Sequence, residues 1–145
     1  MATQPVTRTV GRWTFVADIP FTGSGEDIGF DSDAVIEMEH AMAHWLIANG
    51  AVSKETFRFL RFTAKLKSKE LAELLGTSPE TITRWEKGQH PLPPAEWHIV
   101  ASLALDRLRG SAETIERLRA ARAQSGTDEP LETELDVGLT HRKAS

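Results

Sequence analysis

One short segment of the sequence carries side chains that could read DNA bases. Glu80, Thr83 and Arg84 recur at helical spacing in a predicted helix near residues 79–87, which follows a Gly-Thr-Ser-Pro turn. A guanidinium can make two hydrogen bonds to guanine, whereas threonine and glutamate could contact a thymine methyl group and a cytosine amino group. The amides at the start of such a helix attract phosphate, and its width fits the major groove. The segment is therefore predicted to enter a DNA groove, with Arg84 as the best single candidate for reading a base.

Other polar residues around this helix suit contacts with the DNA backbone, which position a protein without reading the sequence. We predict phosphate contacts from seven of them: Lys67, Ser68, Lys69, Ser78, Lys87, Gln89 and His90. An ordinary helix pair with a solvated polar face would show the same spacing, and short motifs also occur by chance. Spacing alone leaves both interpretations open.

The residues around the turn would hold the second helix in a protruding position. In the first helix, near residues 68–75, three leucines form an apolar face, and Ala72 allows close approach of another helix. Gly76 can adopt the left-handed conformation that ends a helix, Ser78 can cap the next helix, and Pro79 suits its first position. Because the turn is so short, the two helices cross steeply and the second can protrude.

Composition and charge are those of an ordinary globular protein with one local cationic region. The chain has 145 residues, a formal net charge of −4 and no cysteine, which excludes disulfides and thiolate metal sites. Residues 54–90 carry eight lysines and arginines against five glutamates, whereas residues 1–53 carry two against seven acids. This distribution indicates one anion-facing surface. Residues 125–145 are acidic and rich in turn formers, and we expect them to form a disordered tail.

Residues 1–52 are predicted to form a β-hairpin followed by a connecting helix, for dimerisation or partner binding. The opening VTRTVGRWTFVADIPF is typical of two strands with Gly11 as the turn, and residues 22–33 have the composition of a loop. Ser32 or Asp33 would cap a helix that stops at an Asn-Gly pair. The apolar stripe of this helix is expected to be buried: Val35, Met38, Met42, Trp45 and Leu46.

Residues 53–124 are predicted to form five helices, with Ser53 and Ser111 as caps of the first and the last. The first of these helices is apolar on two sides, with Phe59 and Phe62 on the second side. A helix with one side exposed to solvent does not need a second pair of apolar side chains. We therefore expect the helix to be sandwiched between the following helices and either the N-terminal segment or a second subunit.

The segment LRFTAKLKSKELAELLGTSPETITRWEKG, residues 60–88, resembles the helix-turn-helix domain of the Cro/C1-type (XRE) family. The Leu-Arg pair and the ELA, LG-S and W-E-x-G motifs all fall in register without a gap. The resemblance implies a five-helix DNA-binding domain in which an ion pair joins Arg61 to Glu86 beneath the recognition helix. It also implies base contacts from four positions: Pro79, Glu80, Thr83 and Arg84.

Two positions depart from the pattern of that family. Ser68 stands where relatives usually carry a phosphate-binding glutamine, and Lys67 stands where they usually carry serine or threonine. The loop after Gly88 has His90 as its one possible cation. Phosphate contacts are therefore expected to be weaker or differently distributed than in relatives.

A weaker resemblance concerns the N-terminal part of the chain. A β-rich unit, the segment PFTGSGEDI and a connecting helix resemble the MqsA/YgiT class of antitoxins, in which a Cys-x-x-Cys-Gly-Glu zinc knuckle occupies this place. Gly25 and Glu26 are present, but Phe21 and Ser24 stand where the thiols would be, so zinc binding of that kind is excluded. The resemblance implies the antitoxin of a type II toxin-antitoxin pair, with a cognate toxin protein as a partner.

No set of residues predicts a cofactor, a metal site or catalysis, and we expect no enzyme. Glu37, His40 and His44 share one helix face, but a fourth ligand is missing, so a solvated polar surface is the simpler account. No nucleophile set, phosphate loop or carboxylate pair has catalytic spacing. The large aromatic residues Trp13, Trp45 and Trp97 are expected in the core. No apolar leader or membrane-length segment is visible, so we expect a cytoplasmic protein without a membrane partner.

These observations combine into one prediction, a mainly α-helical transcriptional repressor that binds a DNA operator sequence-specifically. One such domain contacts few base pairs, so a homodimer on a palindromic operator would double the footprint. Phe59 and Phe62, or Ile115 and Leu118, are the candidates for contact between subunits. Three alternatives stay open: an antitoxin that also silences a toxin, a stand-alone phage- or plasmid-type regulator, and an adaptor that has lost DNA binding.

Overall fold

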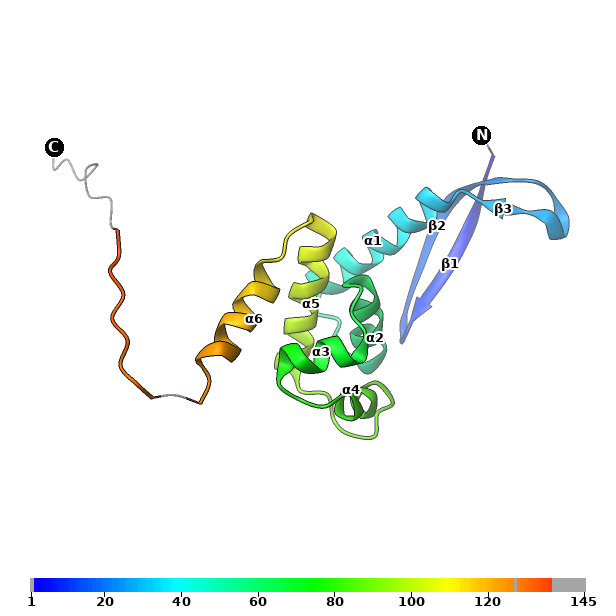
Figure 1. Ribbon diagram of the computed structural model, residues 1–145. Helices are drawn as coiled ribbons and strands as arrows, with labels where there is room; N and C mark the ends of the chain where they lie inside the picture. The colour runs from blue at the N-terminus through cyan, green and yellow to red at the C-terminus, as the bar shows by residue number, and fades with distance from the viewer. Residues whose placement is uncertain (1, 127, 137–145) are drawn as a thin grey trace, which may run out of the picture.

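The protein is mainly helical, with a small antiparallel sheet at the N-terminus, as the sequence predicts (Figure 1). The structure, a computed structural model, describes residues 2–126 and 128–136. The sheet contains β1 (Thr3–Val10), β2 (Trp13–Thr22) and β3 (Gly29–Phe30), with a 3-10 helix at Gly25–Asp27 before β3. Six α-helices follow in the described residues: α1 (Ser32–Ala48), α2 (Lys54–Thr63), α3 (Ser68–Leu75), α4 (Pro79–Glu86), α5 (Pro94–Arg109) and α6 (Glu113–Gln124).

The predicted hairpin is formed by β1 and β2, in a register that places Val10 opposite Trp13. Gly11 has a φ of +59°, which a two-residue hairpin turn requires and glycine adopts without strain. The prediction that residues 22–33 are loop is wrong in several places, because β2 extends to Thr22, a 3-10 helix covers Gly25–Asp27, Gly29–Phe30 pairs with the end of β2, and α1 begins at Ser32. A strand of two residues is too short to have a hydrophobic period, so the sequence carries no signal for it.

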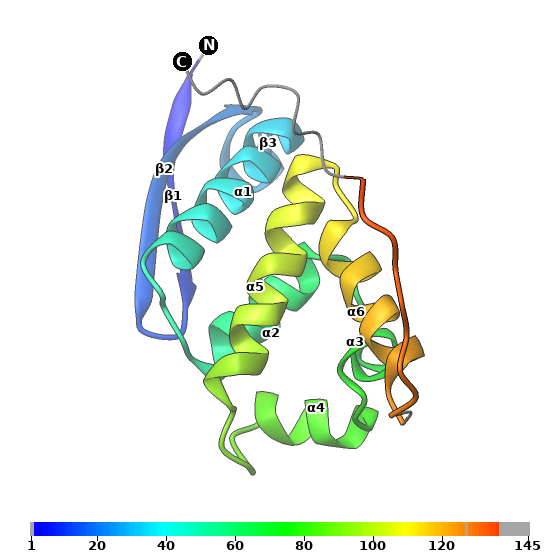
Figure 2. The same cartoon turned by 90° about the vertical axis from the view of Figure 1, so that its left-hand side faces the viewer.

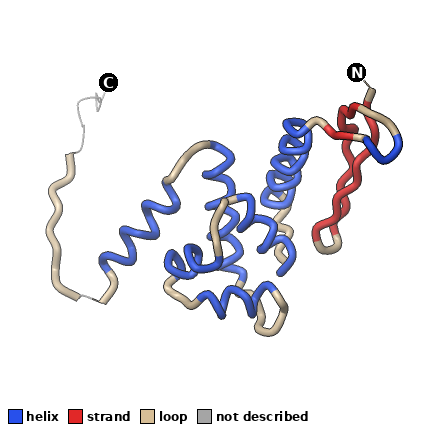
Figure 3. The backbone as a smooth tube through the Cα atoms, turned by 45° about the vertical axis from the view of Figure 1, so that its right-hand side comes forward, coloured by secondary structure: helices blue, strands red, loops and turns tan. Residues whose placement is uncertain are grey.

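Helix α1 packs along one face of the hairpin (Figure 3) and begins one residue earlier than predicted. The carboxylate of Asp31 accepts a hydrogen bond from the amide of Ala34 at 3.1 Å, which makes Asp31 the cap in place of Ser32 or Asp33. A small apolar cluster fills the contact between helix and hairpin, and its buried members are Ile19, Met38 and Met42.

Trp45 departs from the buried stripe predicted for α1. Its side chain is 44% exposed, and its ring meets the ring of Phe15 edge to face, with centroids 5.6 Å apart. The prediction of a core position is therefore wrong for Trp45, because the hairpin covers part of the indole only. It is correct for Trp97 of α5, which is fully buried.

Helices α2 to α5 enclose the main core, and α4 lies at one end of this group (Figure 2). Phe57 of α2, Leu71 of α3, Ile82 of α4 and Trp97 of α5 are all fully buried in it. The core therefore takes a side chain from each of the four helices. Burying large side chains of this kind stabilises a fold by about 1.5–3 kcal/mol each.

Thr56 both caps the start of α2 and forms a hydrogen bond with α5. Its hydroxyl group donates a hydrogen bond to the carbonyl of Ala51 at 2.6 Å and accepts one from the indole N–H of Trp97 at 2.9 Å. It also accepts a hydrogen bond from the Ser53 amide, while the Ser53 hydroxyl caps the Thr56 amide. The position that a capping box would usually fill with glutamate is thus occupied by a residue that also fixes α5.

Phe59 packs against both apolar clusters, the main core and the smaller cluster beneath the hairpin. Helix α2 is therefore sandwiched between the later helices and the N-terminal segment, which was one of the two arrangements predicted. Phe62, one turn further on, is 52% exposed and stays outside both cores.

Helix α6 is held at its start by a residue of α5. The Asp106 carboxylate accepts a hydrogen bond from the amide of Thr114 at 2.7 Å. The prediction of Ser111 as the cap is wrong, because the N-cap is Ala112, although the Ser111 hydroxyl accepts a hydrogen bond from the Glu113 amide at 3.2 Å. Partial burial acts to raise the pKa of Asp106, but the hydrogen bonds from Thr114 outweigh it, and nearby arginines add to them. The pKa of Asp106 is consequently below its ordinary value.

The chain beyond α6 has no helix or strand in residues 128–136. The tail predicted at 125–145 also includes residue 127 and residues 137–145, which lie outside the described residues. Among the helices of the described part, none is long and apolar enough to cross a membrane.

Candidate nucleic-acid interface

The turn between α3 and α4 is built as the sequence predicts. Gly76 ends α3 in the left-handed conformation, with a φ of +69°, and the amide of Thr77 closes the turn on the carbonyl of Ala72 at 2.9 Å. The hydroxyl of Ser78 then accepts a hydrogen bond from the amide of Thr81 at 3.2 Å, and Pro79 takes the first position of α4. The two helices are thus joined by a short turn that stops one and starts the other.

Helix α4 is anchored by one side and exposed on the other. Ile82 is fully buried, and Trp85 meets the ring of Phe57 edge to face, with centroids 6.1 Å apart. Glu80 and Arg84 are exposed, as are Pro79 and the residues that follow the helix. The predicted outward face of α4 is therefore exposed to solvent, apart from Thr83.

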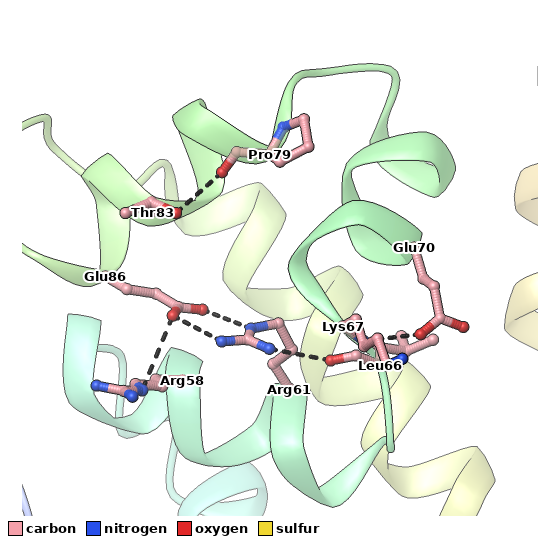
Figure 4. A network of polar contacts seen from close by, with 8 residues as sticks. All are labelled: Arg58, Arg61, Leu66, Lys67, Glu70, Pro79, Thr83 and Glu86. Carbon is pink, nitrogen blue, oxygen red and sulfur yellow. Dashed lines mark hydrogen bonds and ion pairs between the residues drawn. The ribbon is translucent and has the colours of Figure 1, made fainter.

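Thr83 differs from the other candidate base contacts. It is half-buried, and its hydroxyl donates a hydrogen bond to the carbonyl of Pro79 at 3.1 Å (Figure 4). Because the hydroxyl is already engaged, its methyl group is the part left for an apolar contact, such as one with a thymine methyl.

The C-terminal end of α4 is locked to α2 by the ion pair that the resemblance implies (Figure 4). Arg61 donates to Glu86 through Nε at 2.6 Å and through Nη2 at 2.8 Å, and through Nη1 to the carbonyl of Leu66 at 3.0 Å. The two side chains are 8% and 9% exposed. A pair with two hydrogen bonds fixes direction as well as distance, so it holds the orientation of the outward face of α4.

The predicted phosphate contacts fall into two groups, at the two ends of the helix pair. Lys67, Ser68 and Lys69 lie at the start of α3, where the Lys67 amide donates to the carboxylate of Glu70 at 3.0 Å. Both lysines are exposed, whereas Ser68 is half-buried. The carboxylate of Glu70 occupies one of the free amides at this helix end, so the two lysines are the groups left to attract phosphate there.

The second group follows α4 and consists of Lys87, Gln89 and His90, all exposed. Ser78, between the two helices, is half-buried, and its hydroxyl lies 2.9 Å from the hydroxyl of Thr81 while it caps α4. A phosphate contact from Ser78 would therefore have to share a hydroxyl that already serves the fold.

Two cationic residues near this surface were missed by the sequence analysis. Lys54 approaches the loop after α4 so closely that a Cβ at Gly88 would lie 3.0 Å from its Nζ. Arg58 is 62% exposed, and its Nε lies 4.0 Å from Glu86. Both belong to a row of cations in α2, spaced by four and three residues: Lys54, Arg58 and Arg61. That spacing places them on one helix face and could have revealed them.

The histidines considered for a metal site, His40 and His44, are both exposed on α1. Within residues 2–126 and 128–136, no group of three or more His, Asp or Glu side chains is arranged to hold a metal ion. The exposure of both imidazoles agrees with a solvated polar surface.

The geometry of α3, the turn and α4 defines a helix-turn-helix unit, a class of DNA-binding structure. Residues 55–108 match the family model described as a helix-turn-helix domain, and this segment is a domain of the Cro/C1 (XRE) type. The match contains α3 and α4 and nearly all of α2 and α5, with α6 outside it, so the predicted count of five helices is not exact. The domain supports a DNA-binding regulator. No significant match to the chain exists among curated proteins or solved structures.

Proposed function

We propose that this protein is a sequence-specific transcriptional repressor, which acts as a homodimer on a palindromic operator. Repression would result from occupation of promoter DNA and involves no chemical step. The outward face of α4 would read bases in the major groove, with Arg84 as the main reader and Pro79, Glu80 and Thr83 beside it.

The observation that carries this proposal is the two-sided character of α4. Its inner side is fixed by the buried Ile82 and by the Arg61–Glu86 pair. The side chain of Arg84, on the outer side, is exposed and can extend toward a ligand. A base-reading side chain needs a rigid support, because a displaced helix would lose the two-bond geometry on guanine.

Charge supports the same orientation. The exposed lysines at the start of α3 and the exposed Lys87 after α4 lie near one another, since Arg61 binds both the carbonyl of Leu66 and the carboxylate of Glu86, and Lys54 adds a cation beside Gly88. Phosphate contacts beside a reading helix set its register on the duplex. The net charge of −4 is carried elsewhere, since residues 54–90 have a positive balance.

The homodimer follows from the small footprint of one domain. A single helix of eight residues reaches three or four base pairs, whereas two-fold symmetry places two such helices about one DNA turn apart. Three of the four predicted residues for contact between subunits, Phe59, Ile115 and Leu118, pack partly buried against the core of their own chain, which leaves the exposed Phe62 as the best candidate.

Selection of bound fragments from random DNA tests this function most directly. The expected result is a palindromic sequence whose half-sites lie about ten base pairs apart. Affinity for the selected site should fall steeply as salt rises, because cations of the protein release counterions from the phosphates. An adaptor that has lost DNA binding would enrich no sequence and would show no salt dependence, which would refute the proposal.

A second candidate adds a toxin as partner, so that the repressor is also an antitoxin. The observation in its favour is that the hairpin and α1 have an apolar cluster of their own, with Val16 65% exposed on the outer side of β2. Co-expression with the neighbouring reading frame, followed by pull-down through the full-length chain, tests it. A repressor that retains no neighbouring protein would be a stand-alone regulator of the phage or plasmid type.

A further inference from the structure

A groove lies on the side of the domain formed by β1, α1, α2 and the end of α5, with a volume of about 520 Å³. Its apolar lining consists of Ile36, Phe59, Phe62 and Leu108. Ile36 and Phe62 are 50% and 52% exposed, so two large apolar side chains of one groove remain uncovered. Adjacent apolar side chains of this size mark a surface that binds another protein segment.

The rim of the groove is cationic. Arg8, Lys65 and Arg107 line it, and its one acidic residue, Glu39, is paired with Arg8 at 3.3 Å. Lys65 and Arg107 are exposed. The surface therefore fits a segment that carries apolar side chains between acidic ones.

Residues 128–136 of this chain have that composition. The segment reads DEPLETELD, with five acidic residues and no basic one. Leu131 and Leu135 are 75% and 76% exposed, the two most exposed large apolar side chains of the described residues. Their separation of four places them on the same side of the segment, whether it is helical or extended.

We propose that residues 128–136 of one copy dock in this groove on a second copy, and that the reciprocal contact forms the homodimer. The inference rests on the homodimer of the proposed function and names its contact. Leu131 and Leu135 would cover Ile36 and Phe62, while Glu132 and Glu134 between them face the cationic rim. Two identical contacts related by a two-fold axis close the assembly at two subunits.

The course of the chain favours a second copy over the groove of the same chain. Residues 128–136 lie beyond α6, on the side of the domain away from the hairpin (Figures 1 and 3), whereas the groove is lined by residues of β1, α1, α2 and the end of α5. Helix α5 stands between the segment and the hairpin in Figure 1. A segment that leaves the domain on the far side meets the groove of a neighbouring copy without first crossing its own α5.

The groove also adjoins the support of α4. The ring of Phe62 lies 5.4 Å from the guanidinium carbon of Arg58 and 4.7 Å from that of Arg61. Arg61 holds Glu86 of α4. Docking on Phe62 would therefore restrict the same arginines that fix the reading helix, and dimer formation would stiffen the DNA-binding surface.

The test compares two full-length variants whose changes are at exposed positions. The tail variant carries Leu131→Asp and Leu135→Asp, and the groove variant carries Ile36→Asp. Val16→Asp, on the outer side of β2 and 65% exposed, is the matched control. Arg107→Glu is a second groove variant, for use if Ile36→Asp lowers the melting temperature. Sedimentation and native mass spectrometry would give the dimer dissociation constant of each chain.

Each docking-site variant alone should raise the dimer dissociation constant by about tenfold or more, while the control should equal the wild type. A mixture of tail and groove variants should form heterodimers, because the intact tail of one fits the intact groove of the other. Wild-type dimerisation by both variants would overturn the proposal. Absence of heterodimers would also overturn it, because a tail that docks in the groove of its own chain is not rescued by mixing.

The outcome is independent of the proposed function, because the mass measurement contains no DNA. DNA binding by the wild-type chain, measured separately on random fragments, tests the repressor. A chain that binds DNA but dimerises normally in both variants would retain the proposed function and refute the docking. A chain that dimerises through this groove but binds no DNA would support the docking and refute the proposed function.

Discussion

The guanidinium group of Arg61 meets the carboxylate of Glu86 through two hydrogen bonds, 2.6 Å and 2.8 Å long, with both side chains more than 90% buried. Arg61 lies in α2, the first helix of the domain, and Glu86 is the last residue of α4. The pair therefore connects α2 to α4, the helix that we propose to read DNA.

Replacing Glu86 with alanine should lower the free energy of unfolding by about 3–5 kcal/mol, because it leaves the charge of Arg61 buried without a partner. Urea unfolding followed by circular dichroism would measure the loss. Glu113→Ala is the matched control, since the Glu113–Arg117 pair is exposed and its removal should cost about 0.5 kcal/mol or less. Equal small losses in both variants would show that the buried pair does not support the fold.

Replacing Arg84 with alanine should weaken binding to the selected operator by about 1–3 kcal/mol and relax the preference at one base position in each half-site. The expected cause is loss of a two-bond contact with guanine, while the fold stays unchanged because Arg84 is exposed. Binding measured on operators with each base in turn would test this. An equal loss on every sequence would make Arg84 a phosphate contact.

Replacing Lys87 with alanine should weaken binding about equally on all sequences and reduce the salt slope by about one. Arg109→Ala is the control, because Arg109 is an exposed cation at the end of α5 remote from α4. A salt titration of both variants separates the effects. An unchanged slope for Lys87→Ala would place this lysine outside the DNA contact.

Gly76→Ala and Gly110→Ala form a matched pair, since both glycines have a φ of +69°. Each should cost about 1–2 kcal/mol through the left-handed backbone. A Cβ at Gly76 would overlap the Arg122 guanidinium of α6, whereas one at Gly110 meets nothing within 4 Å. Gly76→Ala should therefore cost slightly more, and the difference between the two melting temperatures should vanish when Arg122 is also alanine.

The lowered pKa of Asp106 predicts that the stability of the fold depends on pH. Because its pKa is lower in the folded state, the ionised carboxylate stabilises the fold above the ordinary pKa of aspartate, and this contribution is lost as the pH falls through the folded value. Asp106→Asn should therefore lower the melting temperature at pH 7 and flatten its decline below about pH 4. Parallel pH profiles for wild type and variant would contradict this assignment.

The sequence was sufficient for those parts of the fold that depend on local patterns. Gly76, Ser78 and Pro79 carry their conformations in their own chemistry, so the turn and the start of α4 were predictable from residue type. The Arg61–Glu86 pair joins residues 25 apart and came from the family resemblance, since spacing along one helix cannot reveal a partner on another.

The features that were missed depend on how distant segments approach each other. Lys54 is near the proposed DNA surface because α2 begins beside the loop that contains Gly88, and no local signal reports that approach. Trp45 belongs to a regular apolar stripe, but the hairpin is too narrow to cover it. The groove around Ile36 and Phe62 combines four elements of the chain, so it becomes visible in the folded structure alone.

The ring of Phe59 belongs to the core of the DNA-binding domain and to the cluster beneath the hairpin. A swinging motion of the hairpin would therefore have to open both clusters at once, at the expense of apolar contacts on each side. A protein bound to the hairpin would consequently keep a fixed orientation relative to DNA bound by the domain. The bound protein would cover a defined length of the adjacent duplex. That length would indicate which face of the hairpin the protein occupies.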